Sequence, residues 1–346
     1  RYSTPATERP GSRFITMADV PLIVVGASLG GLSAIATVLK ELSPDIPAAI
    51  LAVIHIGEKN AQLPRYFGTR SLLPVANGRD QEKIVAGRVY LAPNDRHLMV
   101  EHGRLLLSQG PKENHTRPAI DPLFRSAAEV YGPLVTGVIL TGHLTDGTAG
   151  LWEVKRRGGT TIVQDPAEAE VPSMPRSALR HVDIDHCLKL NDIGKLLNRL
   201  AETAVTKALH FASHHGETFM GYTAGQPVAL TCPDCGGALR KDAKGSYTQY
   251  RCHIGHVFGE LELAQAHFDM LDMSLQQSIR LLNERRKMCL DTAEAARRSG
   301  QELEAKQWDQ AAEEASARFE QAEQLLRAVW TRPELATNGD ATLKAK

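Results

Sequence analysis

The sequence lacks a net charge, a long apolar run and an abundance of cysteine. Its 346 residues carry 40 Lys and Arg side chains against 40 Asp and Glu side chains, so nothing indicates a general affinity for nucleic acid. No apolar run reaches the roughly 18 residues of a membrane span, and the N-terminus lacks the apolar core of a signal peptide. A cytoplasmic location is therefore expected, and the five cysteines need not form disulfides.

Three apolar segments are each followed by a polar side chain of a catalytic type. Residues 22–25, 50–54 and 136–140 read as strands that are buried on both faces of a sheet. They are followed by the components of a nucleophilic triad, which are Ser28, His55 and Asp146. Functional residues collect beyond the carboxyl ends of the strands in an open parallel sheet. If these three strand ends meet in space, the protein is a hydrolase.

The segment around Ser28 predicts a strand–turn–helix corner. Gly26, Gly30 and Gly31 permit a sharp turn, and apolar residues recur at helical spacing over residues 32–39. Amides at the start of that helix could bind an oxyanion. The segment matches Gly-x-Ser-x-Gly, but Gly-rich turns of this kind also bind phosphates or only pack a helix against a strand.

The other two residues also have simple structural alternatives. A lone histidine such as His55 after a strand is often structural, and Asp146 with Gly147 could form an ordinary turn. The order Ser, His, Asp differs from the order Ser, Asp, His of α/β-hydrolases, which argues against an ordinary lipase or esterase. Their shared placement after strands is what favours a common site.

Six segments occur in a particular order along the chain: Gly26–Gly31, His55, Val89–His97, Arg117–Phe124, Leu140–Gly147 and Ser173–Arg176. Together they resemble the catalytic domain of the CheB protein-glutamate methylesterases of bacterial chemotaxis. The resemblance covers roughly Pro21 to Ala204. It implies a doubly wound, mostly parallel α/β sheet.

The resemblance also implies the chemistry. Ser28 is the nucleophile, His55 the general base and Asp146 the residue that orients His55. The family hydrolyses γ-glutamyl methyl esters on chemoreceptors through an acyl-enzyme, and deamidation of glutamine is often attributed to it. A methylated chemoreceptor or a related helical signalling protein is the partner it implies, and no cofactor is needed for catalysis.

Two positions near the predicted nucleophile depart from the family pattern. Leu29 stands where relatives usually carry a small polar residue, so only its backbone amide could serve an oxyanion. His143 follows Gly142 where the family usually has Met, and its amide is the second implied donor. The His143 side chain could tune the pH dependence of the reaction, or it could only fill the space of the methionine. The departures at Leu29 and His143 leave the identity of the substrate open.

The segments before and after the catalytic domain predict the domain organisation. Chemotaxis methylesterases carry a receiver domain ahead of the catalytic domain, whereas residues 1–20 here are rich in Pro, Ser, Thr and Arg and read as disordered. A receiver-less catalytic domain is therefore expected over residues 21–204. Histidines, glycines and a proline interrupt any regular pattern over residues 205–228, which read as a linker.

Residues 229–259 have the spacing of a zinc-ribbon-like module. Cys232 and Cys235 form a Cys-x-x-Cys knuckle before two glycines, and Cys252 with His256 supplies the second half. His253 is the alternative to His256 as the fourth ligand. Four protein ligands would make the zinc structural, while free or redox-active thiols are the other reading.

The remaining sequence predicts a helical hairpin over residues 260–332 and a disordered tail over residues 333–346. Apolar residues alternate at steps of three and four in two stripes, and Ser299-Gly300 separates them. The hairpin could pack on the zinc module, or it could provide a surface for self-association or for a partner.

Three functions therefore remain open at the level of sequence. The first is a receiver-less protein-glutamate methylesterase that could also act as a glutamine deamidase. The second is a signalling-associated esterase or amidase of the same fold with another substrate. The third is a non-catalytic scaffold, which the presence of Ser28, His55 and Asp146 disfavours.

Overall fold

The computed structural model describes residues 20–55, 62–211 and 225–328, without the side chains of residues 205–211. The chain divides into two units. The first extends to Cys232 and includes Gly237–Gly259, and the second holds Pro233–Gly236 and the residues from Glu260 onward. The predicted N-terminal extension lies outside the described residues except for Val20, and the predicted C-terminal tail lies wholly outside them.

The first unit is built on a seven-stranded sheet whose strand order is β3-β4-β2-β1-β7-β8-β9. Every pairing recorded in this sheet is parallel, which confirms the predicted doubly wound α/β fold. The strands are β1 (Leu22–Ala27), β2 (Ala49–Ile54), β3 (Val75–Asn77), β4 (Val89–Leu91), β7 (Val135–Ile139), β8 (Thr160–Gln164) and β9 (His186–Leu188). Strands β1, β2 and β7 are buried along their whole length, as their apolar sequences predict.

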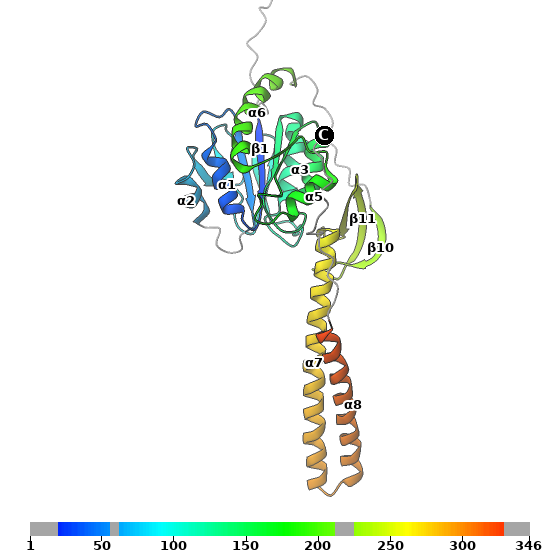
Figure 1. The fold of residues 1–346 in the computed structure, drawn as a ribbon. Coiled ribbons are helices and arrows are strands. Elements are labelled where there is room, and N and C mark those ends of the chain that lie inside the picture. Colours follow the sequence, from blue (N-terminus) through cyan, green and yellow to red (C-terminus); the bar gives the residue numbers. More distant parts are fainter. Residues whose placement is uncertain (1–19, 56–61, 212–224, 329–346) are drawn as a thin grey trace, which may run out of the picture. The chain divides into compact units, whose positions relative to one another are not determined.

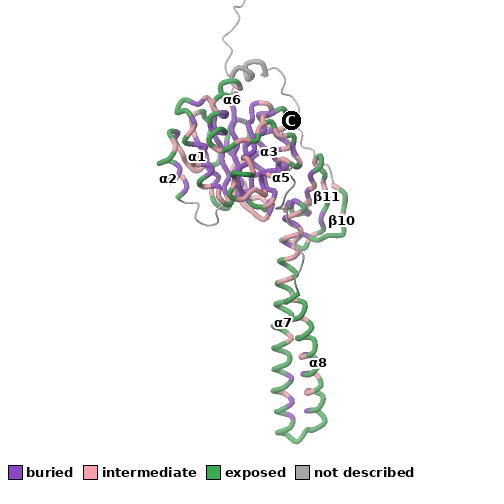
Figure 2. Tube along the Cα trace, viewed as in Figure 1, coloured by how far each residue is buried: buried purple, intermediate pink, exposed green. Residues whose placement is uncertain are grey.

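Helices cover both faces of this sheet, and Figure 1 shows α1 and α2 on one side and α3 and α5 on the other. The helices are α1 (Gly31–Lys40), α2 (Leu63–Gly68), α3 (Ile120–Tyr131), α4 (Thr148–Arg156), α5 (Ser173–His181) and α6 (Leu190–Phe211). Two separate apolar clusters fill the two interfaces, and they form the purple centre of this unit in Figure 2. The sheet is therefore sandwiched between two helical layers.

Strand order reverses between β1 and β7. From β1 the sheet continues through β2 in one direction, and from β7 it continues through β8 in the other. Open parallel sheets bind their ligands beyond the carboxyl ends of the strands at such a switch point. The loops after β1 and β7 therefore occupy the position where a site is expected.

A small antiparallel hairpin, β5 (His97–Glu101) and β6 (Arg104–Ser108), precedes α3. The Val100 amide of β5 donates to the Ser126 hydroxyl on α3, over 3.0 Å. Beyond the catalytic sheet, α6 continues to Phe211, so helix extends into the segment that was predicted as a linker. The interrupting glycines lie further along the chain, from Gly216 onward.

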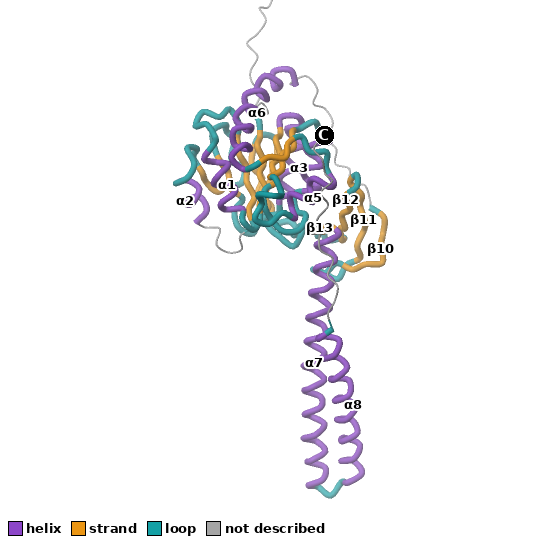
Figure 3. The backbone as a smooth tube through the Cα atoms, viewed as in Figure 1, coloured by secondary structure: helices purple, strands orange, loops and turns teal. Residues whose placement is uncertain are grey.

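A second, antiparallel sheet with the order β10-β11-β12-β13 belongs to the same unit. Its strands are β10 (Gln226–Thr231), β11 (Ala238–Lys244), β12 (Tyr247–Cys252) and β13 (Val257–Gly259), drawn in orange in Figure 3. Strands β11 and β12 form a hairpin that turns at Gly245, whose φ of 61° suits glycine. We call this sheet with its Cys/His loops the ribbon.

The second unit contains two long helices, α7 (Glu260–Arg298) and α8 (Glu302–Arg327), joined at Gly300 as the sequence predicts. Small side chains line the seam where the helices pack: Cys289, Ala293 and Ala296 on α7, and Ala305, Ala312 and Ala315 on α8. Most of their remaining length is exposed, and it is green in Figure 2. Among the described helices, none is long and apolar enough to cross a membrane.

Candidate functional site

Ser28 and His55 are brought together by the pairing of β1 with β2. The last residues of the two strands, Ala27 and Ile54, are register partners. The His55 amide then donates to the Ala27 carbonyl over 3.2 Å. The two candidate catalytic residues therefore follow paired residues on neighbouring strands, and both are partly exposed at the sheet edge.

The loop after β7 passes directly beside Ser28. The Ser28 amide donates to the Thr141 carbonyl over 3.0 Å, across the switch point. Gly142 follows, and a Cβ built on it would overlap the Met174 sulfur and lie 2.8 Å from the Ser28 Cβ. Only glycine therefore lets this loop approach the nucleophile so closely.

Asp146 completes the arrangement from the same loop. Its Oδ2 lies 3.0 Å from His55 Nε2. Two backbone amides at the start of α3 also donate to its carboxylate, Ile120 N to Oδ2 over 2.7 Å and Asp121 N to Oδ1 over 3.2 Å. The carboxylate thus orients the imidazole and also caps α3, where the helix dipole favours negative charge.

The surroundings of Asp146 keep it ionised although it is buried. Burial alone would raise its pKa, but the hydrogen bond and charge of His55, together with donors from Ile120 and Asn114, hold the pKa below its ordinary value. An ionised carboxylate at this position stabilises the protonated form of His55.

The His55 ring has one nitrogen committed to this contact. Nε2 faces Asp146 and also lies 3.3 Å from Thr116 Oγ1. Nδ1 is therefore the ring nitrogen that is not committed to Asp146. Among the described residues, Ser28 Oγ has no hydrogen-bond partner, so the serine–histidine bond is not formed in this structure. Catalytic hydrogen bonds are often long in unliganded enzymes and tighten when substrate binds.

The two predicted oxyanion donors are the amides of Leu29, which follows Ser28, and of His143, which follows the close approach of Gly142 to Ser28. Neighbouring amides are already used, because Ser28 N binds Thr141 O and Gly142 N binds Val171 O. Within the described part of the chain, the amides of Leu29 and His143 have no protein acceptor. The structure therefore leaves available the two backbone donors that the family resemblance implied.

The exposed side chain of His143 is expected to contribute little to the reaction. If only its backbone amide acts, His143→Ala should change kcat/KM by no more than about twofold, which is typical of surface substitutions. Steady-state kinetics of this variant beside His55→Ala test the expectation. A loss for His143→Ala as large as that for His55→Ala would show that the ring takes part in the chemistry.

Sequence reasoning did not identify Asn114, Thr116 or Asp121 as parts of this site. Asn114 Nδ2 donates to Asp146 Oδ1 over 2.9 Å and to Asp121 Oδ2 over 3.2 Å. Asp121 is fully buried, and burial followed by the nearby charge of Asp146 raises its pKa well above the ordinary value. The only available signal was the placement of Asp121 in one of the six ordered segments, which assigns no role.

The ribbon gathers the four predicted metal ligands, namely Cys232, Cys235, Cys252 and His256. Their ligand atoms all lie within 4.8 Å of one another. His256 Nδ1 lies 3.6 Å from Cys232 Sγ and 3.5 Å from Cys252 Sγ. Tetrahedral zinc, with bonds of about 2.3 Å to sulfur and about 2.0–2.1 Å to nitrogen, requires a separation of about 3.6 Å between S and N ligands. The geometry therefore fits zinc, and His253 lies outside the group.

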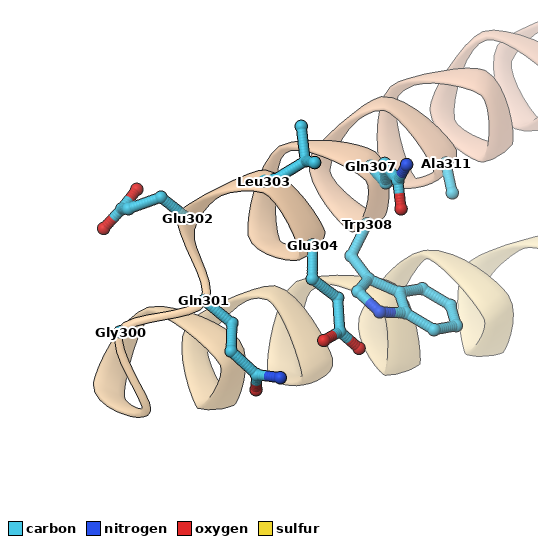
Figure 4. A pocket seen from close by; sticks show the side chains of 8 residues that line it. All are labelled: Gly300, Gln301, Glu302, Leu303, Glu304, Gln307, Trp308 and Ala311. Carbon is cyan, nitrogen blue, oxygen red and sulfur yellow. The ribbon is translucent and has the colours of Figure 1, made fainter.

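A surface hollow also occurs at the turn of the helical hairpin (Figure 4). It is lined by residues between Gly300 and Ala311, including Glu302, Glu304 and Trp308. Figure 4 shows Glu302 and Leu303 pointing away from the neighbouring helix, and Trp308 lying against it. The hollow brings together no nucleophile and base, so it does not compete with the switch point as a candidate active site.

Comparison with known proteins places this geometry in context. Residues 23–197 match the family described as CheB methylesterase. A protein-glutamate methylesterase/protein-glutamine glutaminase of Anaeromyxobacter dehalogenans is 41% identical over 58% of this chain and 59% of its own length. A relative in Leptospira interrogans with the same name, there qualified as putative, is 39% identical over 51% of this chain and 93% of its own length. The CheB methylesterase catalytic domain of Thermotoga maritima superposes with a TM-score of 0.50 at 34% identity, covering 52% of this chain and 98% of that one.

Proposed function

Because the chain belongs to the CheB methylesterase family, we propose that it hydrolyses γ-glutamyl methyl esters on a helical signalling protein of the chemoreceptor type. The family match ends at residue 197, and the match with the Anaeromyxobacter protein spans 59% of that protein. The activity and substrate proposed here therefore concern the segment that carries Ser28, His55 and Asp146. Deamidation of glutamine side chains is the second reaction that the names of the relatives support.

The proposed reaction uses each group of the site in turn. Ser28 Oγ attacks the ester carbonyl while His55 Nδ1 takes its proton, and the oxyanion is held by the amides of Leu29 and His143. The C–O bond to the methoxy group then breaks, and methanol leaves with the proton from His55. Water, deprotonated by His55, attacks the acyl-enzyme; the bond to Ser28 Oγ breaks, His55 returns the proton to that oxygen, and the free glutamate is released. Asp146 stays ionised and orients the ring throughout.

One observation carries this proposal above the alternatives. His55 and the ionised Asp146 lie 3.0 Å apart beside Ser28, at the switch point of the sheet and inside the matched segment. A binding scaffold has no need for a buried carboxylate aimed at a histidine next to a serine.

The test is methanol release from a methylated chemoreceptor incubated with the purified protein. Release above the spontaneous rate supports the methylesterase. Without release, labelling by a serine-reactive organophosphate separates two remaining cases. Labelling of Ser28 indicates another ester or amide substrate, and its absence favours a scaffold.

We further infer that the four grouped Cys and His side chains of the ribbon hold a structural zinc ion. The proposal rests on their donor set and on the separations between the sulfur and nitrogen atoms. Such an ion would cross-link the loops of a small sheet that has little apolar core, and four protein ligands would leave no open position for catalysis.

Metal analysis of the purified protein should find about one zinc ion per chain, as expected for a closed four-ligand site. Cys252→Ser should lose the metal, because one of the four ligands is removed. Cys187→Ser provides the matched control, since Cys187 is exposed and lies outside the group. Equal metal content in both variants would contradict the assignment.

A further inference from the structure

The edge of the ribbon sheet is continued by a loop of the catalytic domain. The Val257 amide donates to the Lys112 carbonyl over 3.4 Å, and the Asn114 amide donates to the Val257 carbonyl over 2.7 Å. This is the alternating pattern of a parallel ladder, and Glu113 and Val257 form a parallel bridge. The segment Lys112–Asn114 therefore pairs with β13 through one parallel bridge, although the two segments are far apart in the sequence.

The backbone of this segment is held in an unusual conformation. Asn114 and His115 both have left-handed φ angles, of 50° and 62°. Such angles are uncommon outside glycine and persist where the surroundings support them. Support comes from the pairing with β13 and from the His115 ring, which packs on the Phe258 ring with centroids 4.8 Å apart.

The Asn114 side chain connects the ribbon to the candidate active site. Its Oδ1 accepts a hydrogen bond from the Gly259 amide at the end of β13, over 3.1 Å. Its Nδ2 donates to Asp146 Oδ1, over 2.9 Å. The residue is only 5% exposed, so neither bond is replaced readily by water. One amide group thus joins the ribbon backbone to the carboxylate that orients His55.

A second contact reaches the Asp146 loop from β12, the strand beside β13. Tyr247 of β12 places its hydroxyl 2.7 Å from the hydroxyl of Thr145, the residue before Asp146, and both side chains are buried. Nearby, Lys244 forms an ion pair with Glu153 on α4, with 2.9 Å between Nζ and Oε1. The ribbon therefore contacts the Asp146 loop directly at Thr145 and α4 at Glu153, and it reaches Asp146 itself through Asn114.

We propose that the ribbon is a positioning element of the active site, which holds Asp146 in place through Asn114 and through the Tyr247–Thr145 contact. This inference rests on the proposed function, since it assigns Asp146 its orienting role. The matched family segment ends at residue 197, before the ribbon begins, so the element lies outside it. The structure thus points to a ribbon that supports catalysis without touching substrate.

The test uses the full chain and removes the link from either end. Asn114→Ala deletes the connecting side chain. Gly259→Pro removes the amide that binds it, which faces the loop and not β12, and it also adds a ring that fixes φ at this buried position. Both should lower kcat about 10- to 100-fold with little change in KM, as a misplaced catalytic group does. Lys241→Ala, on an exposed part of β11, is the matched control and should behave as wild type.

Hydrogen exchange provides a readout that does not depend on activity. The amides of Ile120 and Asp121 are protected by Asp146, so their exchange should accelerate in both variants and stay slow in Lys241→Ala. If the wild type is active and Gly259→Pro changes neither kcat nor the exchange rates, the inference about the ribbon is overturned while the proposed function stands. If the wild type releases no methanol, the proposed function fails, and the exchange result by itself decides whether the ribbon positions Asp146.

Discussion

Ser28→Ala is expected to abolish methanol release while the fold stays intact. The substitution removes one partly exposed oxygen that has no protein partner among the described residues, so the free energy of unfolding should hardly change. The loss in kcat should be about 10⁴- to 10⁶-fold, because no neighbouring group can replace the nucleophile. Methanol release under single-turnover conditions, with far-UV circular dichroism, measures both effects.

Ser43→Ala is the matched control for this experiment. Ser43 follows the opposite end of α1 and is exposed, so its loss should leave the rate unchanged. Labelling with a serine-reactive probe should occur in wild type and in Ser43→Ala but not in Ser28→Ala. Activity that survives in Ser28→Ala would assign the nucleophile elsewhere and remove the basis of the triad.

Asp146→Asn is expected to cost both activity and stability. An amide cannot accept from all the donors that converge on this position, since one of its two ends is itself a donor. His55 would lose its orienting partner, and kcat should fall about 10⁴-fold, as when an orienting aspartate is replaced in other triads. An unsatisfied buried donor should also lower the free energy of unfolding by about 1–3 kcal/mol.

Two measurements separate these effects. Chemical denaturation of Asp146→Asn gives the loss of stability, and kinetics below the transition give the loss of rate. Asp183→Asn provides the comparison, because the Asp183 side chain is 90% exposed and should show neither effect. If Asp146→Asn were less stable but fully active, Asp146 would be only the cap of α3.

The fold and the three strand-end residues could be predicted because the strands themselves can be recognised from short segments of sequence. Strands β1, β2 and β7 are continuous apolar runs, and each is followed by a polar residue, so parallel pairing alone places Ser28 and His55 on neighbouring strands. The Cys/His group could be predicted for a similar reason, since ligand spacing reflects the tight turns that zinc requires.

The supporting residues could not be predicted in this way. Asn114 bonds to Asp146, which is 32 positions away, and to Gly259, which is 145 positions away. No periodicity or spacing in one sequence connects such partners. The docking of the ribbon likewise depends on contacts between distant residues, such as Tyr247 and Thr145, which are 102 positions apart.

The buried carboxyls of Asp121 and Asp146 make the stability of the fold depend on pH, because folding shifts their pKa values in opposite directions. The pKa of Asp121 is raised on folding, by burial first, and that of Asp146 is lowered, since hydrogen bonds to its charged form outweigh burial. The unfolded carboxyl pKa is about 4, and the folded pKa of Asp121 lies above it. At a pH between these two values, Asp121 takes up a proton as the chain folds. Its contribution to stability is therefore lost as the pH rises across that interval. Asp146 acts in the opposite sense, contributing above about pH 4 and losing that contribution as pH falls. One carboxyl thus carries the charge that directs the histidine, while burial and that charge raise the pKa of its neighbour.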